Sequence, residues 1–162
     1  MDRMPPVEKV YEAWTSIVDG RVNFAGSPVD PAHVKGGSTL PRKGEATISS
    51  SNGGKEYRIT WDGDTYASTD SATYWQGYPG YPVIAVLMLQ GRLSMDLDSA
   101  KLFSGVSWKR INDSHRRDYE AALEEVFEGS GLSSDEVCHC KEQAAQVYGE
   151  LEGMDLTIRR KL

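Results

Sequence analysis

The longest uninterrupted apolar run of the chain covers residues 83–89 and lies between two halves with different hydrophobic patterns. Apart from one helix, the sequence before this run has the alternation and turn residues of strands and loops, whereas apolar residues after it mostly recur at helical spacing. Tyr81-Pro82 before the run and Gly91 after it favour a short buried helix, because proline fits the first helical turn. A run this short has no readable period, so a buried strand stays open as the alternative.

The first half predicts one helix and then a β-meander. Apolar residues recur at helical spacing over 7–18, between Pro5-Pro6 and Gly20, which indicates a helix with a single apolar stripe. The segments with strand character that follow are 21–24, 46–50, 55–61, 64–69 and 73–75.

A two-residue hairpin signal, Asp62-Gly63, sets the expected register of the meander. With this turn, Trp61 faces Asp64 and Ile59 faces Tyr66 across the two strands. One face of the sheet is then aromatic and aliphatic, and the other face is mainly polar.

Residues 25–44 have no periodicity and are rich in glycine and proline. A loop of this length is uncommon inside a compact domain and is usually functional or disordered. We expect a flexible surface loop, and a lid that covers a ligand is the alternative. Its basic residues include Lys35, Arg42 and Lys43, but 35–39 lacks the residue order and the following helix of a phosphate-binding loop.

Helical spacing dominates the second half. A short helix is expected over 95–103 with Ser94 as its cap, and a longer helix begins after Ser107. The longer helix either runs unbroken to 128 or breaks at Asn112-Asp113 and restarts.

The C-terminal part of the chain has the clearest local signals. Ser133 and Glu136 form a capping box that starts the last helix. Apolar and polar residues then alternate over 154–158, which indicates a final strand returning to the sheet, and 159–162 is a short basic tail.

Together these elements predict an α+β fold, with a small antiparallel β-meander sheet and about four to five helices packed on one face. The length of 162 residues favours a single domain over 1–162 that folds without a metal or a disulfide. The residues expected to be buried in its core are Trp61, Ile84, Leu87, Trp108, Leu123 and Val147.

The net charge of −6 disfavours general nucleic-acid binding, although a local basic patch remains compatible with it. No apolar run approaches membrane-spanning length, and the N-terminus lacks the apolar segment of a signal peptide. We therefore expect a cytoplasmic protein without a membrane partner.

An aromatic loop consisting of Tyr74, Trp75, Tyr78 and Tyr81, together with prolines and glycines, is the first candidate site. Aromatic side chains with polar tips suit ligand stacking or partner recognition. The alternative is structural, with the rings covering the core where the chain changes from β to α.

The second candidate site is a basic set of four residues, Lys109, Arg110, Arg116 and Arg117. If the helix restarts at Asp113 or Ser114, the two arginines lie in its first turn, where acidic residues are preferred. Such a local anomaly indicates an anion site for a phosphate or a carboxylate. An unbroken helix, or pairing with the chain's own carboxylates, would remove the anomaly.

Metal and catalytic motifs are weak. Cys138, His139 and Cys140 are consecutive on a predicted helix, so they cannot converge on one ion, and the two thiols point to different faces. Asp62-Gly63-Asp64 lacks the further ligands of a calcium loop. We expect no metal and no cofactor, and the three histidines of the chain identify no catalytic base.

Three functions remain open from the sequence. The first is a non-enzymatic binding or adaptor domain for a protein or a small molecule, using the aromatic loop. The second is a binder of nucleic acid or of a phosphate ligand, using the basic set and the tail. The third is a small hydrolase or transferase, which lacks a recognisable nucleophile and base.

Overall fold

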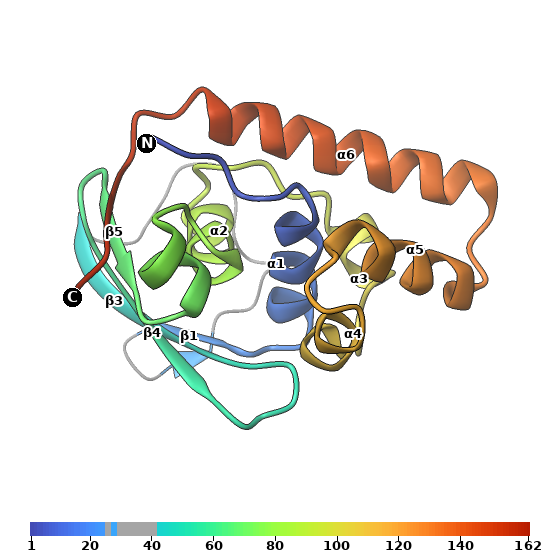
Figure 1. Cartoon of the computed structure of the whole chain (residues 1–162). Helices are drawn as coiled ribbons and strands as arrows, with labels where there is room; N and C mark the ends of the chain where they lie inside the picture. Colours follow the sequence, from blue (N-terminus) through green and yellow to red (C-terminus); the bar gives the residue numbers. More distant parts are fainter. Residues whose placement is uncertain (25–26, 29–41) are drawn as a thin grey trace.

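Figure 1 shows the computed structural model of the chain, which describes residues 1–24, 27–28 and 42–162. The helices are α1 (Glu8–Val18), the π-helical turn η2 (Ala72–Gln76), α2 (Tyr81–Leu89), α3 (Leu97–Lys101), α4 (Trp108–Ser114), α5 (Tyr119–Ser130) and α6 (Ser134–Glu152). The strands are β1 (Val22–Phe24), β2 (Ser27–Pro28), β3 (Lys43–Ser49), β4 (Glu56–Asp62), β5 (Thr65–Ser68) and β6 (Thr157–Arg159).

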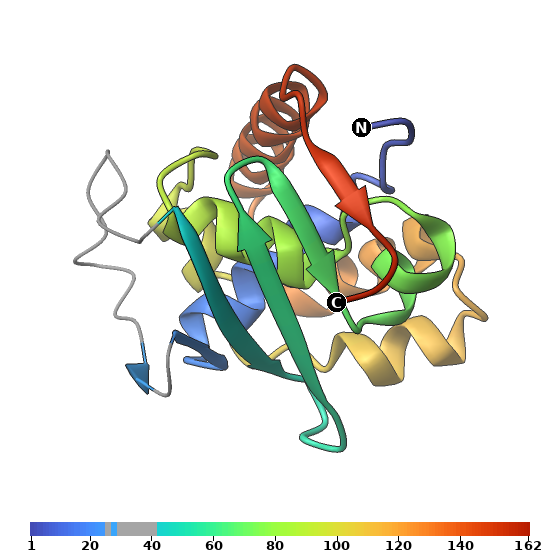
Figure 2. The same ribbon diagram turned by 90° about the vertical axis from the view of Figure 1, so that its left-hand side faces the viewer.

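The described strands form one sheet in the order β2-β1-β3-β4-β5-β6. All neighbours are antiparallel except β5 and β6, which run parallel because the chain passes through the whole helical layer before β6 returns to the sheet. Figure 2 shows the sheet in front and the helices behind it, so the helices cover one face. The α+β prediction and the final strand are confirmed, whereas the expected antiparallel sheet is corrected at β6.

The register of the β4–β5 hairpin differs from the prediction. Trp61 pairs with Tyr66 and Ile59 pairs with Ser68, so the turn is formed by Gly63 and Asp64 rather than by Asp62 and Gly63. The shift is two residues, and side chains alternate with a period of two, so every side chain keeps its predicted face. Ile59 and Trp61 accordingly lie buried under the helices.

α2 passes through the middle of the molecule and is buried around its whole circumference from Pro82 to Leu89. Gly80 precedes it, and Pro82 lies in its first turn. A backbone N–H at this position would have no acceptor within the helix, so proline, which lacks the N–H, is tolerated there. The central apolar run is therefore a helix and not a strand. All the predicted core residues are buried, namely Trp61, Ile84, Leu87, Trp108, Leu123 and Val147.

α1 is also buried on nearly all sides, which corrects the expectation of a single apolar stripe. Every residue from Lys9 to Ile17 is buried, because α2, α3, α5 and α6 all contact this helix. Its polar residues Lys9, Glu12, Thr15 and Ser16 therefore lie inside the protein. The Thr15 hydroxyl accepts a hydrogen bond from Trp108 Nε1 (2.8 Å) and donates one to the Phe103 carbonyl (2.8 Å).

The strand expected over 73–75 does not form, and this segment is the π-helical turn η2. The Asp70 carboxylate accepts a hydrogen bond from the Thr73 backbone N–H (3.0 Å), and the Thr73 hydroxyl accepts one from the Gly80 N–H (2.9 Å). Such side-chain bonds to the backbone offer an alternative to a sheet ladder.

Two helix boundaries after α2 also differ from the prediction. Ser94 does not cap α3, because its backbone N–H and its hydroxyl both donate to the Glu150 carboxylate of α6 (2.7 Å each). The long helix after Ser107 breaks, but it breaks after Ser114 and restarts at Tyr119. Asp118 caps the new helix by accepting a hydrogen bond from the Ala121 N–H (3.2 Å).

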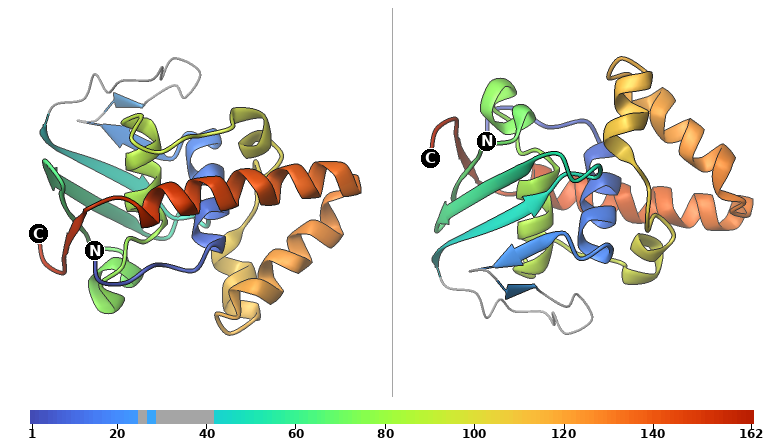
Figure 3. Two further views of the ribbon diagram at one scale, coloured as in Figure 1. Left: turned by 90° about the horizontal axis from the view of Figure 1, so that it is seen from above. Right: turned by 90° about the horizontal axis from the view of Figure 1, so that it is seen from below.

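The capping box of α6 is confirmed, with the Ser133 hydroxyl accepting from the Glu136 N–H (3.1 Å) and the Glu136 carboxylate accepting from the Ser133 N–H (3.0 Å). Figure 3 shows α6 lying across the helical layer, with the C-terminal end of α5 next to the N-terminal end of α6. The buried stripe of α6 consists of Cys140, Ala144, Val147 and Leu151.

Most of the predicted loop 25–44, including Lys35, lies outside the described residues. Its last residues, Lys43 and Gly44, belong to β3 rather than to a loop. Within residues 1–24, 27–28 and 42–162, no helix has the length and the apolarity needed to cross a bilayer.

Candidate functional site

A cavity of about 100 Å³, here called the polar pocket, lies among α1, α4, the end of β3, the start of η2 and the N-terminus of α2. It is unusual because charged and phenolic side chains line it, and two of the charged ones, Lys9 and Glu12, are buried. Its lining residues are Lys9, Glu12, Arg21, Ser50, Ser51, Tyr57, Asp70, Ser71, Ala72, Tyr81, Trp108, Lys109, Asn112, Asp113, Arg117 and Tyr119.

A buried ion pair on α1 forms one side of the polar pocket. Lys9 Nζ lies 3.0 Å from Glu12 Oε2, and the two side chains are only 8% and 6% exposed. The other carboxylate oxygen, Glu12 Oε1, accepts a hydrogen bond from Asn112 Nδ2 (3.0 Å). Glu12 Oε2 is buried and, apart from the Lys9 ammonium, has no partner among the described residues.

Lys9 keeps its charge in this position. Its burial lowers the pKa of the ammonium group, but the Glu12 carboxylate and the surrounding tyrosines more than offset this effect, and the pKa lies above its ordinary value. The Lys9 ammonium also sits 4.1 Å from the centre of the Tyr119 ring, a cation–π contact. The pocket therefore contains a protonated lysine at neutral pH.

Tyr57 and Tyr81 contribute hydroxyl groups that stay protonated. Burial raises the pKa of the Tyr81 hydroxyl well above its usual range, and the positive charge of Arg21 opposes this only in part. Burial likewise raises the pKa of Tyr57. At neutral pH both phenols are hydrogen-bond donors and not phenolates.

Arg21 follows α1 and brings a half-buried guanidinium to the pocket. Its Nη1 donates to the Ser49 carbonyl (2.7 Å), which holds the side chain against β3. Its Nε is buried and has no hydrogen-bond partner within the described part of the chain. A buried charged donor without an acceptor is costly, so this group is available to an anion.

Asp70, in contrast, is committed to the fold. Its carboxylate accepts hydrogen bonds from the Ser68 hydroxyl and from the Thr73 N–H, which holds η2 in place. Gly80 packs directly against this carboxylate, where a Cβ atom would collide with Asp70 Oδ2. Asp70 therefore shapes the pocket wall rather than offering a free acceptor.

Lys109 and Arg117 lie at the mouth of the polar pocket. Lys109 Nζ is paired with Asp113 Oδ2 one turn further along α4 (3.0 Å). Arg117 is exposed and has no carboxylate within ion-pair distance among residues 1–24, 27–28 and 42–162. It is thus a second cation that no carboxylate of the described residues neutralises.

The backbone at Arg116 and Arg117 is strained. The Arg117 N–H donates to the Asn112 carbonyl (2.8 Å) and the Arg116 N–H to the Asp113 carbonyl (3.1 Å), which together form a Schellman motif at the end of α4. Both arginines have positive φ, 53° and 65°, where a Cβ atom costs about 1–2 kcal/mol. The other left-handed residues of the described chain are all glycines, namely Gly20, Gly53, Gly63, Gly77, Gly91, Gly105 and Gly131.

A second hollow, here called the outer groove, adjoins the polar pocket and has a volume of about 630 Å³. Both hollows are lined by Tyr57, Ser71, Lys109 and Arg117, so they lie side by side. The outer groove adds Tyr74 and Trp75 from η2, and Trp75 is 68% exposed.

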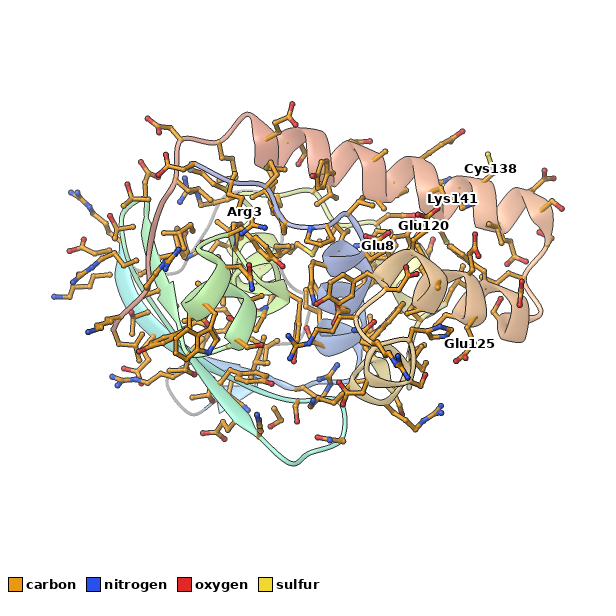
Figure 4. All side chains as sticks on the ribbon, in the orientation of Figure 1. Arg3, Glu8, Glu120, Glu125, Cys138 and Lys141 are labelled. Carbon is orange, nitrogen blue, oxygen red and sulfur yellow. The ribbon has the colours of Figure 1, made fainter. Side chains whose placement is uncertain are left out.

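The structure divides the aromatic loop between three environments. Tyr74 and Trp75 line the outer groove, whereas Tyr81 lines the polar pocket. Tyr78 is buried, with the Arg3 guanidinium 5.2 Å from its ring centre. Figure 4 shows Arg3 beside η2, where its side chain also donates to the Gln76 carbonyl (3.3 Å).

The basic set is divided as well. Lys109 and Arg117 line both hollows, whereas Arg110 and Arg116 are exposed and line neither. Arg116 and Arg117 lie between α4 and α5 and not in a first helical turn, so the expected conflict with the helix dipole does not arise. Their anomaly is the left-handed backbone instead.

Sequence reasoning missed Lys9, Glu12 and Arg21. Lys9 and Glu12 fall outside the apolar stripe of α1, and such residues are normally placed on a solvent-exposed face. No local signal distinguishes them from surface charges, because their burial results from helices that lie far along the chain.

The cysteines behave as their spacing predicts, with Cys140 buried and Cys138 exposed. Figure 4 shows Cys138 pointing outward from α6, away from the rest of the protein. His139 Nε2 lies 2.8 Å from the Asp96 carboxylate. In the described residues, no three side chains of His, Cys, Asp or Glu are grouped so as to hold a metal ion.

Comparison with known proteins gives one match. A family model described as Uncharacterised conserved protein UCP014422 matches residues 2–157. No curated protein and no solved structure matches the chain.

Proposed function

The chain belongs to the family of uncharacterised conserved proteins UCP014422, and from the geometry of the polar pocket we propose that it is a binding protein for a small ligand with a phosphate or carboxylate group. The ligand's anionic group contacts Arg21 and Arg117. This proposal combines parts of the aromatic loop and of the basic set in one site.

The balance of charges in the polar pocket supports an anion. It is lined by four cationic side chains and three carboxylates, namely Lys9, Arg21, Lys109 and Arg117, and Glu12, Asp70 and Asp113. Two of the carboxylates are paired with Lys9 and Lys109, and the Asp70 carboxylate accepts hydrogen bonds from the Thr73 N–H and the Ser68 hydroxyl. Among the described residues, the guanidinium groups of Arg21 and Arg117 have no carboxylate partner, although the whole chain carries a charge of −6.

The single observation that carries the proposal is the buried Arg21 Nε without a hydrogen-bond partner in the described chain. Native proteins rarely leave a buried charged donor unpaired, and an unpaired one calls for a ligand, an ion or water. The cavity of about 100 Å³ is somewhat smaller than a cavity that holds benzene, so it suits a single phosphate or carboxylate group.

The test uses inorganic phosphate and acetate as probes, measured by calorimetry at constant ionic strength. The wild type should bind at least one of them, and Arg117→Gly should weaken that binding about tenfold, because one charge-assisted hydrogen bond is lost. Arg117→Gly should at the same time raise the free energy of unfolding by about 0.5–1 kcal/mol, since glycine relieves the positive φ.

Arg116→Gly is the matched control. It removes the same side chain from a neighbouring left-handed position, and it should stabilise the protein to a similar degree without changing anion affinity. A wild type that binds neither probe would refute the proposal. Equal losses of affinity in the two variants would also refute it, because general electrostatic attraction would then explain the binding.

A further inference from the structure

We infer that the ligand of the polar pocket also carries a planar ring, which stacks on Trp75 in the outer groove while its anionic group lies at Arg117. This inference rests on the proposed function and specifies the ligand class, an aromatic phosphate or carboxylate such as a nucleotide. It uses the adjacency of the two hollows, which share Tyr57, Ser71, Lys109 and Arg117.

The exposure of Trp75 is the first observation behind the inference. Trp75 is 68% exposed, whereas Trp14, Trp61 and Trp108 are at most 4% exposed. An exposed indole at the rim of a groove offers a stacking surface, and stacking on it does not depend on the identity of a base. Tyr74 packs against it edge to face, with ring centres 4.7 Å apart.

The second observation is that η2 holds Trp75 in place. The Asp70 carboxylate and the Thr73 side chain fasten η2 from one side, and Arg3 Nη1 donates to the Gln76 carbonyl and to Gln76 Oε1 from the other side. π-helical turns are rare and are frequent at functional sites. A platform that is already fixed loses little entropy when a ring stacks on it.

The third observation is size. The outer groove has a volume of about 630 Å³, within the usual range for small-ligand sites, whereas the polar pocket holds only one small group. A ligand that fills both hollows has a compact anionic end and a larger flat end. The cationic side chains shared by the two hollows, Lys109 and Arg117, lie where these two ends meet.

The experiment compares ligands that share one phosphate and differ in the ring. Calorimetry on the full chain should show that a nucleoside monophosphate binds about tenfold more tightly than ribose 5-phosphate, the gain expected for one stacked base. Phenyl phosphate carries a ring without the hydrogen-bonding edge of a base. Its affinity therefore shows whether the site requires a nucleotide or accepts other aromatic anions. Either of the two ring-bearing phosphates binding more tightly than ribose 5-phosphate supports the inference.

Trp75→Ala should abolish this preference and leave the affinity for ribose 5-phosphate unchanged. Leu102→Ala is the matched control, because Leu102 is another exposed apolar side chain (39%) that lines neither hollow. The preference should survive in this control, and the fluorescence of the exposed tryptophan should change only when a ring-bearing ligand binds.

The outcomes separate the two proposals. If ribose 5-phosphate and inorganic phosphate bind and the ring adds nothing, the inference fails and the anion site stands. A tenfold preference that persists in Trp75→Ala would also overturn it. If neither acetate nor a phosphate of any kind binds, the proposed function fails together with the inference.

Discussion

Two polar clusters lie at opposite ends of α2, and they differ in how well their buried groups are satisfied. At the C-terminal end, the Tyr66 hydroxyl donates to Gln90 Oε1 (2.6 Å) and accepts from Arg92 Nη1 (2.9 Å). Arg92 Nη2 then pairs with the Asp64 carboxylate (2.6 Å). At the N-terminal end lies the polar pocket, where the buried Arg21 Nε has no hydrogen bond within the described residues.

This difference separates a structural cluster from a candidate site. A fully satisfied network offsets the cost of burying its polar groups, so it stabilises one arrangement of the fold. An incompletely satisfied network stays costly until a ligand or water completes it. The same contrast appears in the backbone, since glycines occupy the ordinary left-handed turns while Arg116 and Arg117 occupy the strained ones beside the pocket.

The largest expected effect comes from Lys9→Met. This substitution keeps the bulk of the side chain but leaves the Glu12 carboxylate buried without its cation. Removal of one partner from a buried ion pair costs about 3–5 kcal/mol of the free energy of unfolding, which chemical denaturation would measure.

The double variant Lys9→Met with Glu12→Gln controls for lost packing, because it removes both charges. It should recover most of the lost stability, since no isolated buried charge remains. A single variant as stable as the wild type would mean that water reaches the pair, and the two ends of α2 would no longer differ as described.

A smaller effect is expected at the satisfied end. Tyr66→Phe removes a hydroxyl that bonds both Gln90 and Arg92, and it should cost about 1–3 kcal/mol in denaturant unfolding without changing anion affinity. Tyr57→Phe is the matched change at the pocket, where the hydroxyl has no hydrogen bond to another described residue. It should cost less than about 0.5 kcal/mol, and similar losses at the two positions would contradict the comparison.

The smallest expected effect is at alkaline pH. In the folded protein Tyr81 keeps its proton at pH values where the unfolded chain has begun to lose it, because burial raises its pKa. The stability that this group contributes is complete below about pH 10 and falls as the pH rises further. At about pH 10.5 the wild type should have lost about 0.8 kcal/mol more than Tyr81→Phe, relative to pH 8. Parallel stability curves for the two proteins would show that Tyr81 is not shielded from water.

Several features of the fold follow from short-range signals and were therefore predictable. The capping box of Ser133 and Glu136 satisfies backbone groups within one helical turn, so neighbouring residues suffice to specify it. Pro82 at the start of α2 and the alternation through Ile59 and Trp61 act in the same way. Even the error in the hairpin register left every side chain on its predicted face.

The candidate site was only partly predictable. Trp75, Tyr81, Lys109 and Arg117 stand out in the sequence by residue type, but the sequence groups them with Tyr78, Arg110 and Arg116, which line neither hollow. Lys9, Glu12 and Arg21 carry most of the buried charge of the pocket and have no local signature.

The sequence by itself determined the α+β class and the residues of the core, because these depend on hydrophobic periodicity and local capping. For the central apolar run it favoured a helix, and the tertiary structure excluded the strand. Only the tertiary structure decided that α1 is buried on nearly all sides, that Lys9 and Glu12 lie inside, and that β6 joins the sheet in parallel. These outcomes depend on contacts between residues far apart in the chain. The cost of burying a charge is set by what surrounds it in the folded protein, and no neighbouring residue records that environment.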